Sequence, residues 1–315
     1  MVSKHACDSG INIPLMTWRG EEIPLLTLGT AQLGIPGYGV ANRNDAVEQL
    51  EVEGIVAAAW NVGIRIFDTA QCYGDAEERL GNVFSRTGLP SPRVITKLSP
   101  ELEPDDCAAI KESLAFSRSR LGLSCLWGVM LHRFSWLEKW GEGLGGTLLR
   151  EKEDGNVKHL GVSVYEADEA IESIHHPDID IIQIPINVWD RRMIRAGVLE
   201  AAKKYGKLLF LRSIFLQGLL LLSPEEAEQR VRGVGKASEN WHAVAANLGI
   251  GPRELALSWA AGLGWPMVIG VEAEQQVAEI AQGVSNQRLE EKQRIHLEQR
   301  LGDIDDEHIL DPRSW

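Results

Sequence analysis

The chain alternates short apolar segments with longer segments of helical periodicity from one end to the other, without a linker or a low-complexity break. Runs such as residues 181–184 are apolar at nearly every position, which is typical of strands covered on both faces of a parallel sheet. We predict strands at residues 25–29, 64–68, 94–98, 126–131, 160–163, 181–185, 208–212 and 267–269.

Helical periodicity occupies the intervals between these strands. We predict helices at residues 46–59, 76–84, 107–121, 166–174, 194–205 and 253–263. Asp75, with Glu78 three positions later, resembles a capping box at one helix start. Eight β/α units in 315 residues favour an α/β fold of the closed (β/α)8 TIM-barrel type over a doubly wound sheet. We therefore predict one barrel domain over residues 1–315, with a hairpin within 11–24 that closes the barrel bottom.

Composition excludes several classes of protein. The hydrophobic content of 44% and charged content of 24% are those of a globular protein, and no apolar run approaches the roughly 20 residues that span a bilayer. No signal peptide is visible, so we expect a cytoplasmic location. The net charge of −13 argues against a general nucleic-acid binder, which needs a basic surface. We expect neither nucleic acid nor membrane as a partner, and monomer and homo-oligomer both stay open.

Four polar side chains lie at or just after the ends of three neighbouring predicted strands. Asp68 ends the second strand and Tyr73 lies in the loop that follows, while Lys97 and His132 lie at the ends of the third and fourth. Barrel enzymes carry their chemistry at the carboxyl ends of strands, so these side chains should meet. We predict that Lys97 lowers the pKa of the Tyr73 phenol, that Asp68 orients Lys97, and that His132 hydrogen-bonds the reacting oxygen.

A phenol that protonates a carbonyl oxygen performs half of a carbonyl reduction. The other half is hydride transfer, which no side chain supplies, so a nicotinamide cofactor is implied. Each of the four residues also has a structural interpretation by itself, as an ion pair, a buried histidine or a packed loop tyrosine. Their coincidence at adjoining strand ends favours a shared catalytic site.

The sequence resembles the aldo-keto reductase family over essentially its whole length. The matching stretches are LGTAQLG at 28–34, FDTA at 67–70, YG at 73–74, ERLG at 78–81, TK at 96–97, LH at 131–132, GVS at 161–163, Gln183 with Asn187, and QGLL at 217–220. The resemblance implies a (β/α)8 barrel that reduces an aldehyde or ketone to an alcohol with NADPH or NADH. It also implies Tyr73 as the general acid, supported by Asp68, Lys97 and His132.

The same resemblance implies which residues contact the cofactor. Ser163 and Gln183 match positions that hold the nicotinamide carboxamide, and Glu279 matches one that contacts adenine. Arg212 stands where many members place an aromatic ring against the nicotinamide, and a guanidinium also stacks on a flat ring. Further cofactor contacts are expected at Gly29, Thr30, Ser213, Gly270, Glu272 and Gln276.

The segment after the eighth strand bears on the choice of nucleotide. Members that prefer NADPH offer basic side chains to the 2′-phosphate, whereas residues 270–276 contain Glu272 and Glu274 and no base. A carboxylate repels that phosphate but accepts a hydrogen bond from a free ribose hydroxyl. Our hypothesis is that NADH is used at least as well as NADPH.

Loops are expected to set the specificity for a small carbonyl substrate. Arg43, Arg133 and the Arg191/Arg192 pair suit an anionic or polyhydroxylated compound, although each has a solvated or structural alternative. Trp189 is a candidate for the pocket wall. We expect a sugar-like carbonyl compound, and we expect residues 310–315 to pack across the barrel mouth or against a neighbouring molecule.

Weaker patterns point to no further chemistry. GEGLGG at 141–146 satisfies G-x-G-x-x-G but follows no strand, so a turn is expected. GVGK at 233–236 lacks the first glycine and the hydroxyl of a phosphate loop, and we expect an ordinary loop. His175 and His176 lack further ligands at metal-site spacing, and no metal is expected. Cys72 is either a reactive thiol near Tyr73 or a small packed side chain.

Three classes of function stay open on the sequence. The first is a carbonyl reductase, the second a redox-neutral epimerase or lyase that retains its nicotinamide, and the third a regulatory subunit that keeps the barrel and the cofactor. The intact set of four polar residues favours chemistry over regulation alone.

Overall fold

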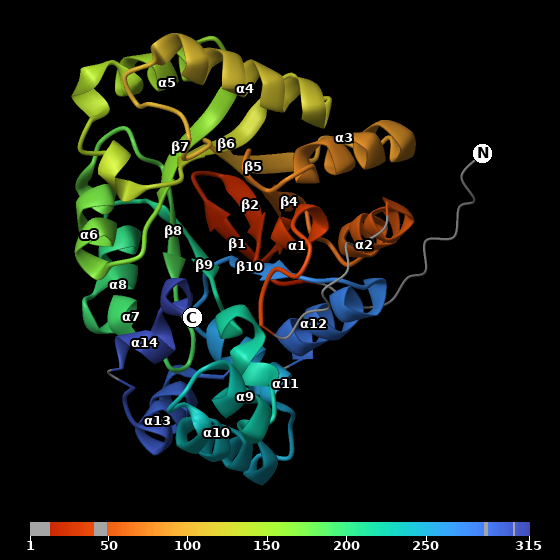
Figure 1. Ribbon diagram of the computed structural model, residues 1–315, viewed down its shortest axis with the longest axis vertical. Helices are drawn as coiled ribbons and strands as arrows, with labels where there is room; N and C mark the ends of the chain where they lie inside the picture. Colours follow the sequence, from red (N-terminus) through yellow and green to blue (C-terminus); the bar gives the residue numbers. More distant parts are fainter. Residues whose placement is uncertain (1–12, 41–48, 287–288, 305) are drawn as a thin grey trace.

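Eight parallel strands close into a barrel in the order β10-β3-β4-β5-β6-β7-β8-β9, and helices surround it (Figure 1). The structure is a computed structural model that describes residues 13–40, 49–286, 289–304 and 306–315. The predicted (β/α)8 barrel is therefore confirmed.

The barrel strands lie where the apolar runs predict them. All residues of β6 and β8 are buried, because helices cover one face of each strand and the barrel core fills the other. The strands are β3 (Leu26–Gly29), β4 (Ile66–Asp68), β5 (Arg93–Lys97), β6 (Leu126–Leu131), β7 (Val157–Ser163), β8 (Ile181–Pro185), β9 (Leu208–Arg212) and β10 (Met267–Gly270).

The helices follow the predictions closely, with one interruption. The segment predicted as one helix at 194–205 is divided, because Gly197 has a left-handed φ of 72° between α7 and α8. The helices are α1 (Ala31–Gly34), α2 (Gln49–Asn61), α3 (Ala76–Thr87), α4 (Cys107–Leu121), α5 (Leu144–Glu153), α6 (Ala167–His175), α7 (Arg192–Arg195), α8 (Val198–Lys204), α9 (Pro224–Arg230), α10 (Gly235–Asn247), α11 (Pro252–Ala261), α12 (Glu274–Asn286), α13 (Glu291–Leu301) and α14 (Glu307–Leu310).

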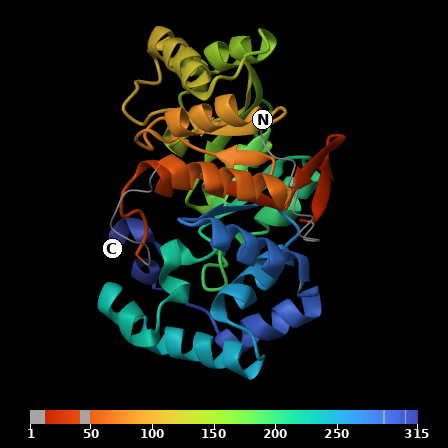
Figure 2. The ribbon, with the colours of Figure 1, turned by 90° about the vertical axis from the view of Figure 1, so that its right-hand side faces the viewer.

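The predicted hairpin is present as β1 (Leu15–Trp18) and β2 (Glu21–Pro24), and it closes the end of the barrel where the strands begin. The Trp18 ring lies 4.9 Å from the imidazole of His159, near the start of β7. The Trp127 indole, near the start of β6, donates to the Glu21 carboxylate at 3.1 Å. Figure 2 shows the hairpin and the carboxyl terminus on opposite sides of the barrel. The carboxyl ends of the strands therefore open away from the hairpin.

The predicted capping box at the start of α3 is wrong. Asp75 is the N-cap residue but its side chain makes no capping hydrogen bond. Instead its carboxylate pairs with Nε of Arg79 at 2.8 Å, one turn along the helix. The ion pair thus takes the carboxylate that the box would have used.

The two glycine-rich stretches do not have the strand–loop–helix setting that their motifs require. Residues 141–146 follow no strand, as expected, and run from a 3-10 turn (Trp140–Glu142) into α5. The loop predicted at 233–236 is only half correct, because α10 begins at Gly235. The backbone N–H groups of Gly233 and Gly235 donate to the Glu228 carboxylate at 2.9 and 2.7 Å. The chain's own carboxylate therefore occupies these donors.

Within the described ranges, no helix is long and apolar enough to cross a membrane. In the same residues, no group of three or more His, Cys, Asp or Glu side chains is placed to hold a metal ion. His175, which ends α6, and His176, which follows it, belong to no such group among the described residues.

Candidate functional site

Asp68 and Lys97 form a buried ion pair at the ends of the neighbouring strands β4 and β5. The Lys97 ammonium donates to the two carboxylate oxygens at 2.8 and 2.7 Å and to the carbonyl oxygen of Thr69 at 3.3 Å. The Gln183 amide, on β8, donates to the same carboxylate at 2.9 Å. All three donors of the ammonium are thus engaged, which offsets the cost of burying its charge.

Tyr73 is held by a closely packed loop after β4. The Gln71 backbone N–H donates to the Lys97 carbonyl at 3.0 Å, and its side-chain oxygen accepts from the Ser99 N–H at 2.8 Å. A Cβ on Gly34 would lie 2.0 Å from the Tyr73 carbonyl oxygen. Only glycine at position 34 permits this approach, so α1 and the loop fix the position of Tyr73 together.

The structure brings the four predicted catalytic side chains together. The Tyr73 ring lies 6.1 Å from the His132 ring in an edge-on arrangement, and the Lys97 nitrogen lies 5.3 Å from the Tyr73 ring centroid. In the part of the chain that the structure describes, no hydrogen bond engages the phenol oxygen of Tyr73. This oxygen is available to a molecule in the cavity.

In the protein without ligands, the lowering of the Tyr73 pKa that we predicted from Lys97 is outweighed by other effects. Burial, and next the negative charge of Asp68, raise the pKa of Tyr73 well above its usual value. The reason is that Asp68 neutralises Lys97 at short range, so the phenol meets a compensated pair instead of an isolated cation. Tyr73 is therefore a fully protonated phenol at neutral pH.

His132 is a neutral imidazole in this site. Burial, followed by the positive charges of Lys97 and Arg212, lowers the pKa of His132 to about 4. The thiol of Cys72, a residue at the surface, lies 3.5 Å from His132 Nδ1, and partial removal of the sulfur from water raises the pKa of that thiol. Cys72 therefore contacts the site, but as an un-ionised thiol and not as an activated nucleophile.

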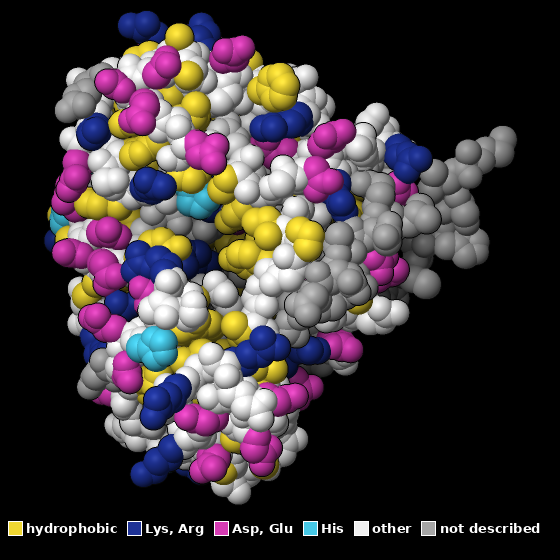
Figure 3. All heavy atoms as spheres, in the orientation of Figure 1, with side chains coloured by type: hydrophobic (Ala, Val, Ile, Leu, Met, Phe, Trp, Pro, Cys, Tyr) yellow, Lys and Arg dark blue, Asp and Glu magenta, His cyan; other side chains and the backbone are white. Residues whose placement is uncertain are grey.

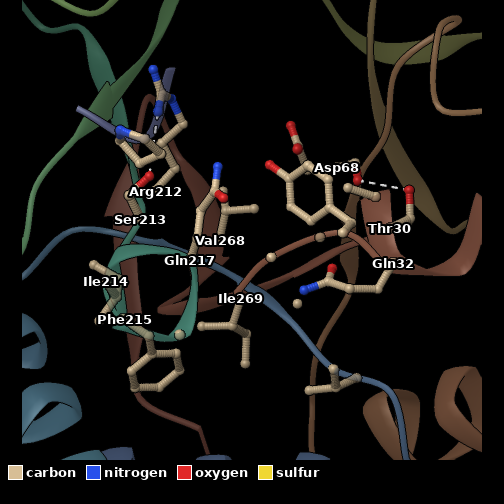
Figure 4. A pocket seen from close by; sticks show the side chains of 18 of the residues that line it. Thr30, Gln32, Asp68, Arg212, Ser213, Ile214, Phe215, Gln217, Val268 and Ile269 are labelled. Atoms are coloured by element: carbon tan, nitrogen blue, oxygen red, sulfur yellow. Dashed lines mark hydrogen bonds between the residues drawn. The ribbon is translucent and has the colours of Figure 1, made fainter. Parts of the chain in front are cut away.

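A cavity of about 400 Å³ runs along the carboxyl ends of the strands. Figure 4 shows Arg212 and Ser213 on one wall and Asp68 and Thr30 on the opposite wall. The predicted cofactor residues that line this cavity are Gly29, Thr30, Gln183, Arg212, Ser213, Gly270, Glu272 and Gln276.

Two predicted cofactor residues do not line the cavity. Ser163 is buried at the end of β7, and Glu279 pairs instead with the Arg253 guanidinium. Arg253 itself, from α11, lies in the cavity wall near Glu272 and Gln276. The sequence segment after β10 contains no base, and only the fold brings one to this end.

The loop after β9 has unusual backbone conformations. Ser213, Leu216 and Gln217 have φ values of 62°, 48° and 52°, in the left-handed region that side chains other than glycine rarely adopt. Such conformations persist where the surrounding structure enforces them, often at binding sites. Ser213 and Gln217 accordingly present their side chains and backbone to the cavity.

None of the predicted substrate residues that the structure describes lines the cavity. Arg43 lies outside the described residues. Arg133 is exposed and Trp189 is 2% exposed, and neither lines the cavity. The Arg191 guanidinium donates to the carbonyl of Glu298 at 3.0 Å and pairs with an aspartate beyond α13. For Arg191 the structural alternative is therefore correct, because it ties the loop after β8 to α13.

Arg192, the second member of that pair, also has a structural role. Its guanidinium binds the two oxygens of Asp190 at 3.0 Å each and the Glu166 carboxylate at 2.9 Å. These bonds join the loop after β8 to the start of α6. Its charge is compensated by two carboxylates.

Several residues of the cavity wall were not predicted from the sequence. Tyr38 and Tyr165 line it together with Tyr73, so three of the four tyrosines of the chain meet there. Tyr165 follows the end of β7 by two residues, so the strand-end rule contained a signal for it. Pro312 and Arg313 also line the cavity, which decides that the tail packs across the barrel mouth. The sequence had left packing across the mouth and packing against a neighbouring molecule as alternatives.

Comparisons with known proteins show a family model, several relatives and solved structures to which this chain is similar. The model of the Aldo/keto reductase family matches residues 25–299. Aldo-keto reductase str7 of Strobilurus tenacellus is 32% identical over 219 residues, which are 66% of this chain and 63% of that protein. An aldo-keto reductase of Mycobacterium sp. is 25% identical over 200 residues, 60% of this chain and 64% of its own length. These matches span somewhat less than two thirds of either relative.

A further relative and a solved structure cover larger shares. The D-threo-aldose 1-dehydrogenase of a Pseudomonas species is 28% identical over 248 residues, which are 67% of this chain and 75% of that protein. The holo form of aldo-keto reductase AKR11C1 from Bacillus halodurans has a TM-score of 0.75 at 16% identity and covers 94% of this chain and 99% of its own. At this identity the structural match shows the shared fold.

Proposed function

This chain belongs to the aldo/keto reductase family, a family of oxidoreductases, and we propose that it reduces an aldehyde or ketone to an alcohol with NADH or NADPH. The observation that carries the proposal is the grouping of Tyr73, His132 and the Asp68–Lys97 pair, of which Asp68 and Tyr73 line the cavity. Three separate strands contribute these groups, and a purely structural ion pair would require neither the phenol nor the imidazole.

The donor set of the cavity suits a dinucleotide. It is lined by the hydroxyl and amide side chains of Thr30, Gln183, Ser213 and Gln276. Gly29 and Gly270, which end the paired strands β3 and β10, also line it and add no side chain to fill it. A bound reduced nicotinamide supplies the hydride for the carbonyl carbon. The chain's own residues supply the positioning and the proton.

In the proposed reaction, the Tyr73 O–H donates its proton to the carbonyl oxygen as that oxygen gains negative charge. The neutral His132 imidazole donates a hydrogen bond to the same oxygen. The Lys97 ammonium, held by Asp68, faces the phenolate that remains and limits the cost of its charge. Solvent then returns a proton to Tyr73.

The test is Tyr73→Phe, which removes the proton and keeps the ring. We expect kcat to fall about 10²- to 10⁴-fold, the usual contribution of a general acid, with the Kd of the nicotinamide unchanged. Tyr205→Phe is the matched control, because Tyr205 is an exposed tyrosine at the end of α8. Full turnover by Tyr73→Phe would refute the assignment. A nicotinamide that is bound but never oxidised by any carbonyl compound would favour the redox-neutral enzyme or the regulatory subunit.

For the nucleotide, the proposal is that NADH serves at least as well as NADPH. Glu272 lies in the cavity wall, where its carboxylate disfavours a 2′-phosphate. Arg253 lies at the same end, but its charge is compensated by Glu279. Titration of the protein with each nucleotide tests this, and at least tenfold tighter binding of NADPH would contradict it. In that case Arg253→Gln would abolish the preference.

The proposed substrate is a sugar-like carbonyl compound. The wall near Tyr73 is rich in hydroxyl, amide and guanidinium groups, including those of Tyr38, Tyr165 and Gln217, which suit a polyhydroxylated molecule. The related D-threo-aldose 1-dehydrogenase supports the same class. Exclusive turnover of flat aromatic aldehydes in a substrate panel would count against it.

A further inference from the structure

Arg212, at the end of β9, presents an uncompensated guanidinium to the cavity. Its Nη2 donates to the Val164 carbonyl at 3.0 Å and its Nη1 to the Ser213 hydroxyl at 3.3 Å. Both acceptors are neutral, and the described residues offer Arg212 no carboxylate. An arginine has five N–H donors, so these bonds leave several for a ligand.

The other arginines near the mouth differ in this respect. The Arg313 guanidinium, on the tail, binds both oxygens of Asp311, and Arg192 binds both oxygens of Asp190. Their charges are neutralised within the protein. Figure 3 shows Lys and Arg side chains beside the central hollow of this face. Of the arginines that line the cavity, Arg212 is the one whose charge no carboxylate of the described residues compensates.

Tyr165 holds Arg212 in a fixed orientation. The Arg212 guanidinium carbon lies 4.2 Å from the centroid of the Tyr165 ring, and that of Arg313 lies 3.8 Å from the same centroid. The tail therefore presses a second guanidinium onto the ring that supports the first. A guanidinium held in this way loses little freedom when it binds a planar or tetrahedral anion.

Arg212 also lies close to the reacting groups. After burial and the charge of Lys97, the positive charge of Arg212 is the next largest cause of the lowered pKa of His132. The same charge opposes the rise in the pKa of Tyr73. Because Asp68 compensates Lys97, Arg212 provides the net positive charge at this end of the cavity. The chain as a whole carries −13, so an anion is attracted here by a local cation and not by the general surface.

We propose that the substrate of this enzyme carries a carboxylate or phosphate group, which the N–H edge of Arg212 binds while the carbonyl faces Tyr73. The inference rests on the proposed reductase function and narrows its substrate class from sugar-like compounds to anionic ones. It is compatible with a nicotinamide ring against Arg212, because stacking uses the face of the guanidinium and the anion uses its edge.

The test compares matched carbonyl pairs. Glyceraldehyde 3-phosphate with glyceraldehyde tests the phosphate, and succinic semialdehyde with butanal tests the carboxylate. We expect kcat/KM to be about tenfold or more higher for the anionic member of at least one pair, as a charge-assisted bidentate contact would give. Arg212→Gln should lower kcat/KM of the anionic member more than that of the neutral member, through KM, and so remove the advantage. Arg86→Gln, an exposed arginine on α3, is the control.

Two outcomes would overturn the inference. One is equal turnover of both members of each pair by the unaltered enzyme, and the other is an equal loss for both members in Arg212→Gln. If Arg212→Gln instead weakens nicotinamide binding, the guanidinium serves the cofactor. Arg212→Lys, which keeps the charge and loses the planar fork, should retain part of the preference and covers the case in which Arg212→Gln does not fold.

Failure of the reductase proposal is detected separately. If no carbonyl compound is reduced, calorimetry of the nicotinamide-loaded protein with glycerol 3-phosphate and with glycerol still measures the anion subsite. Binding of glycerol 3-phosphate that is lost in Arg212→Gln supports the subsite without turnover. Equal binding of the two compounds rejects it.

Discussion

The ammonium of Lys97 donates to both carboxylate oxygens of Asp68, at 2.8 and 2.7 Å, and so joins the ends of two neighbouring strands. Both side chains are almost fully buried. The pair therefore has no net charge beside Tyr73. Removal of one partner would leave the other as an unpaired buried charge.

Removal of Lys97 alone should be severely destabilising. Lys97→Met leaves the Asp68 carboxylate buried without its cation, and we expect a loss of about 3–5 kcal/mol in the free energy of unfolding. Chemical denaturation measures this. The double variant Asp68→Asn with Lys97→Met should recover most of the stability but not the turnover. A single variant as stable as the unaltered protein would show that the carboxylate finds another partner.

The neutral state of His132 predicts a pH dependence of stability. Its pKa is lowered to about 4 in the folded protein, whereas an unfolded histidine titrates near 6.5. The unfolded state therefore takes up this proton first, and stability should decline from pH 6.5 towards pH 4 by up to roughly 3 kcal/mol. His132→Asn should lack that component when unfolding is followed over the same range. Parallel pH curves for the two proteins would contradict it.

Gly34 should be essential for the position of Tyr73. In Gly34→Ala the new methyl would meet the Tyr73 carbonyl at 2.0 Å, so the loop must move. We expect a destabilisation of about 1–3 kcal/mol and at least tenfold lower kcat, because a small displacement of the acid costs much in rate. Gly146→Ala, in α5, meets nothing within 4 Å and should stabilise slightly by helix propensity. Equal kcat in both variants would disprove the role.

Asp180 should stabilise the opposite end of the barrel in a pH-dependent way. Burial raises its pKa, but hydrogen bonds from His159, Lys152 and Arg19 outweigh that effect and hold the pKa of Asp180 well below its usual range. This stability is fully present at neutral pH, begins to decline below about pH 4, where the unfolded carboxyl takes up its proton, and is lost only at a much lower pH where the folded carboxyl is protonated. Asp180→Asn should therefore lower the melting temperature at pH 7 and lower it by less at pH 3. Nicotinamide affinity should be unchanged, since the hairpin end lies away from the cavity.

The barrel itself was predictable because its determinants are local. β6, β8 and β9 begin and end at the predicted residues, since each is a continuous apolar run bounded by polar or turn-forming residues. The order of strands follows from short right-handed crossovers, which place successive strands side by side. That rule alone places Asp68 next to Lys97. The predicted capping box at Asp75 is wrong because the Asp75 carboxylate has two possible partners, a backbone N–H of the first helical turn and the Arg79 guanidinium. Both lie close in the sequence, so the sequence alone does not show which of them the carboxylate binds.

The predicted substrate arginines that the structure describes do not line the cavity, whereas the four side chains predicted to be catalytic do lie together. Arg191 and Arg192 follow a strand end, as catalytic residues do, but carbonyls and carboxylates from distant segments bind them. Whether a guanidinium is satisfied depends on what the fold brings to it. The same contacts determine that Arg212 retains donors for a ligand.

By itself the sequence determined the barrel, the strand ends that carry Asp68 and Lys97, and the loop that carries Tyr73, because apolar periodicity and strand-end position are properties of short segments. Only the tertiary structure decided the charge state of the site, the approach of Arg253 to the far end of the cavity, and the stacking of the tail on Tyr165. Those depend on burial and on contacts between residues up to about 150 positions apart, such as Tyr165 and Arg313. Such contacts leave no periodic signal along the chain, since each partner is an ordinary residue in its own neighbourhood.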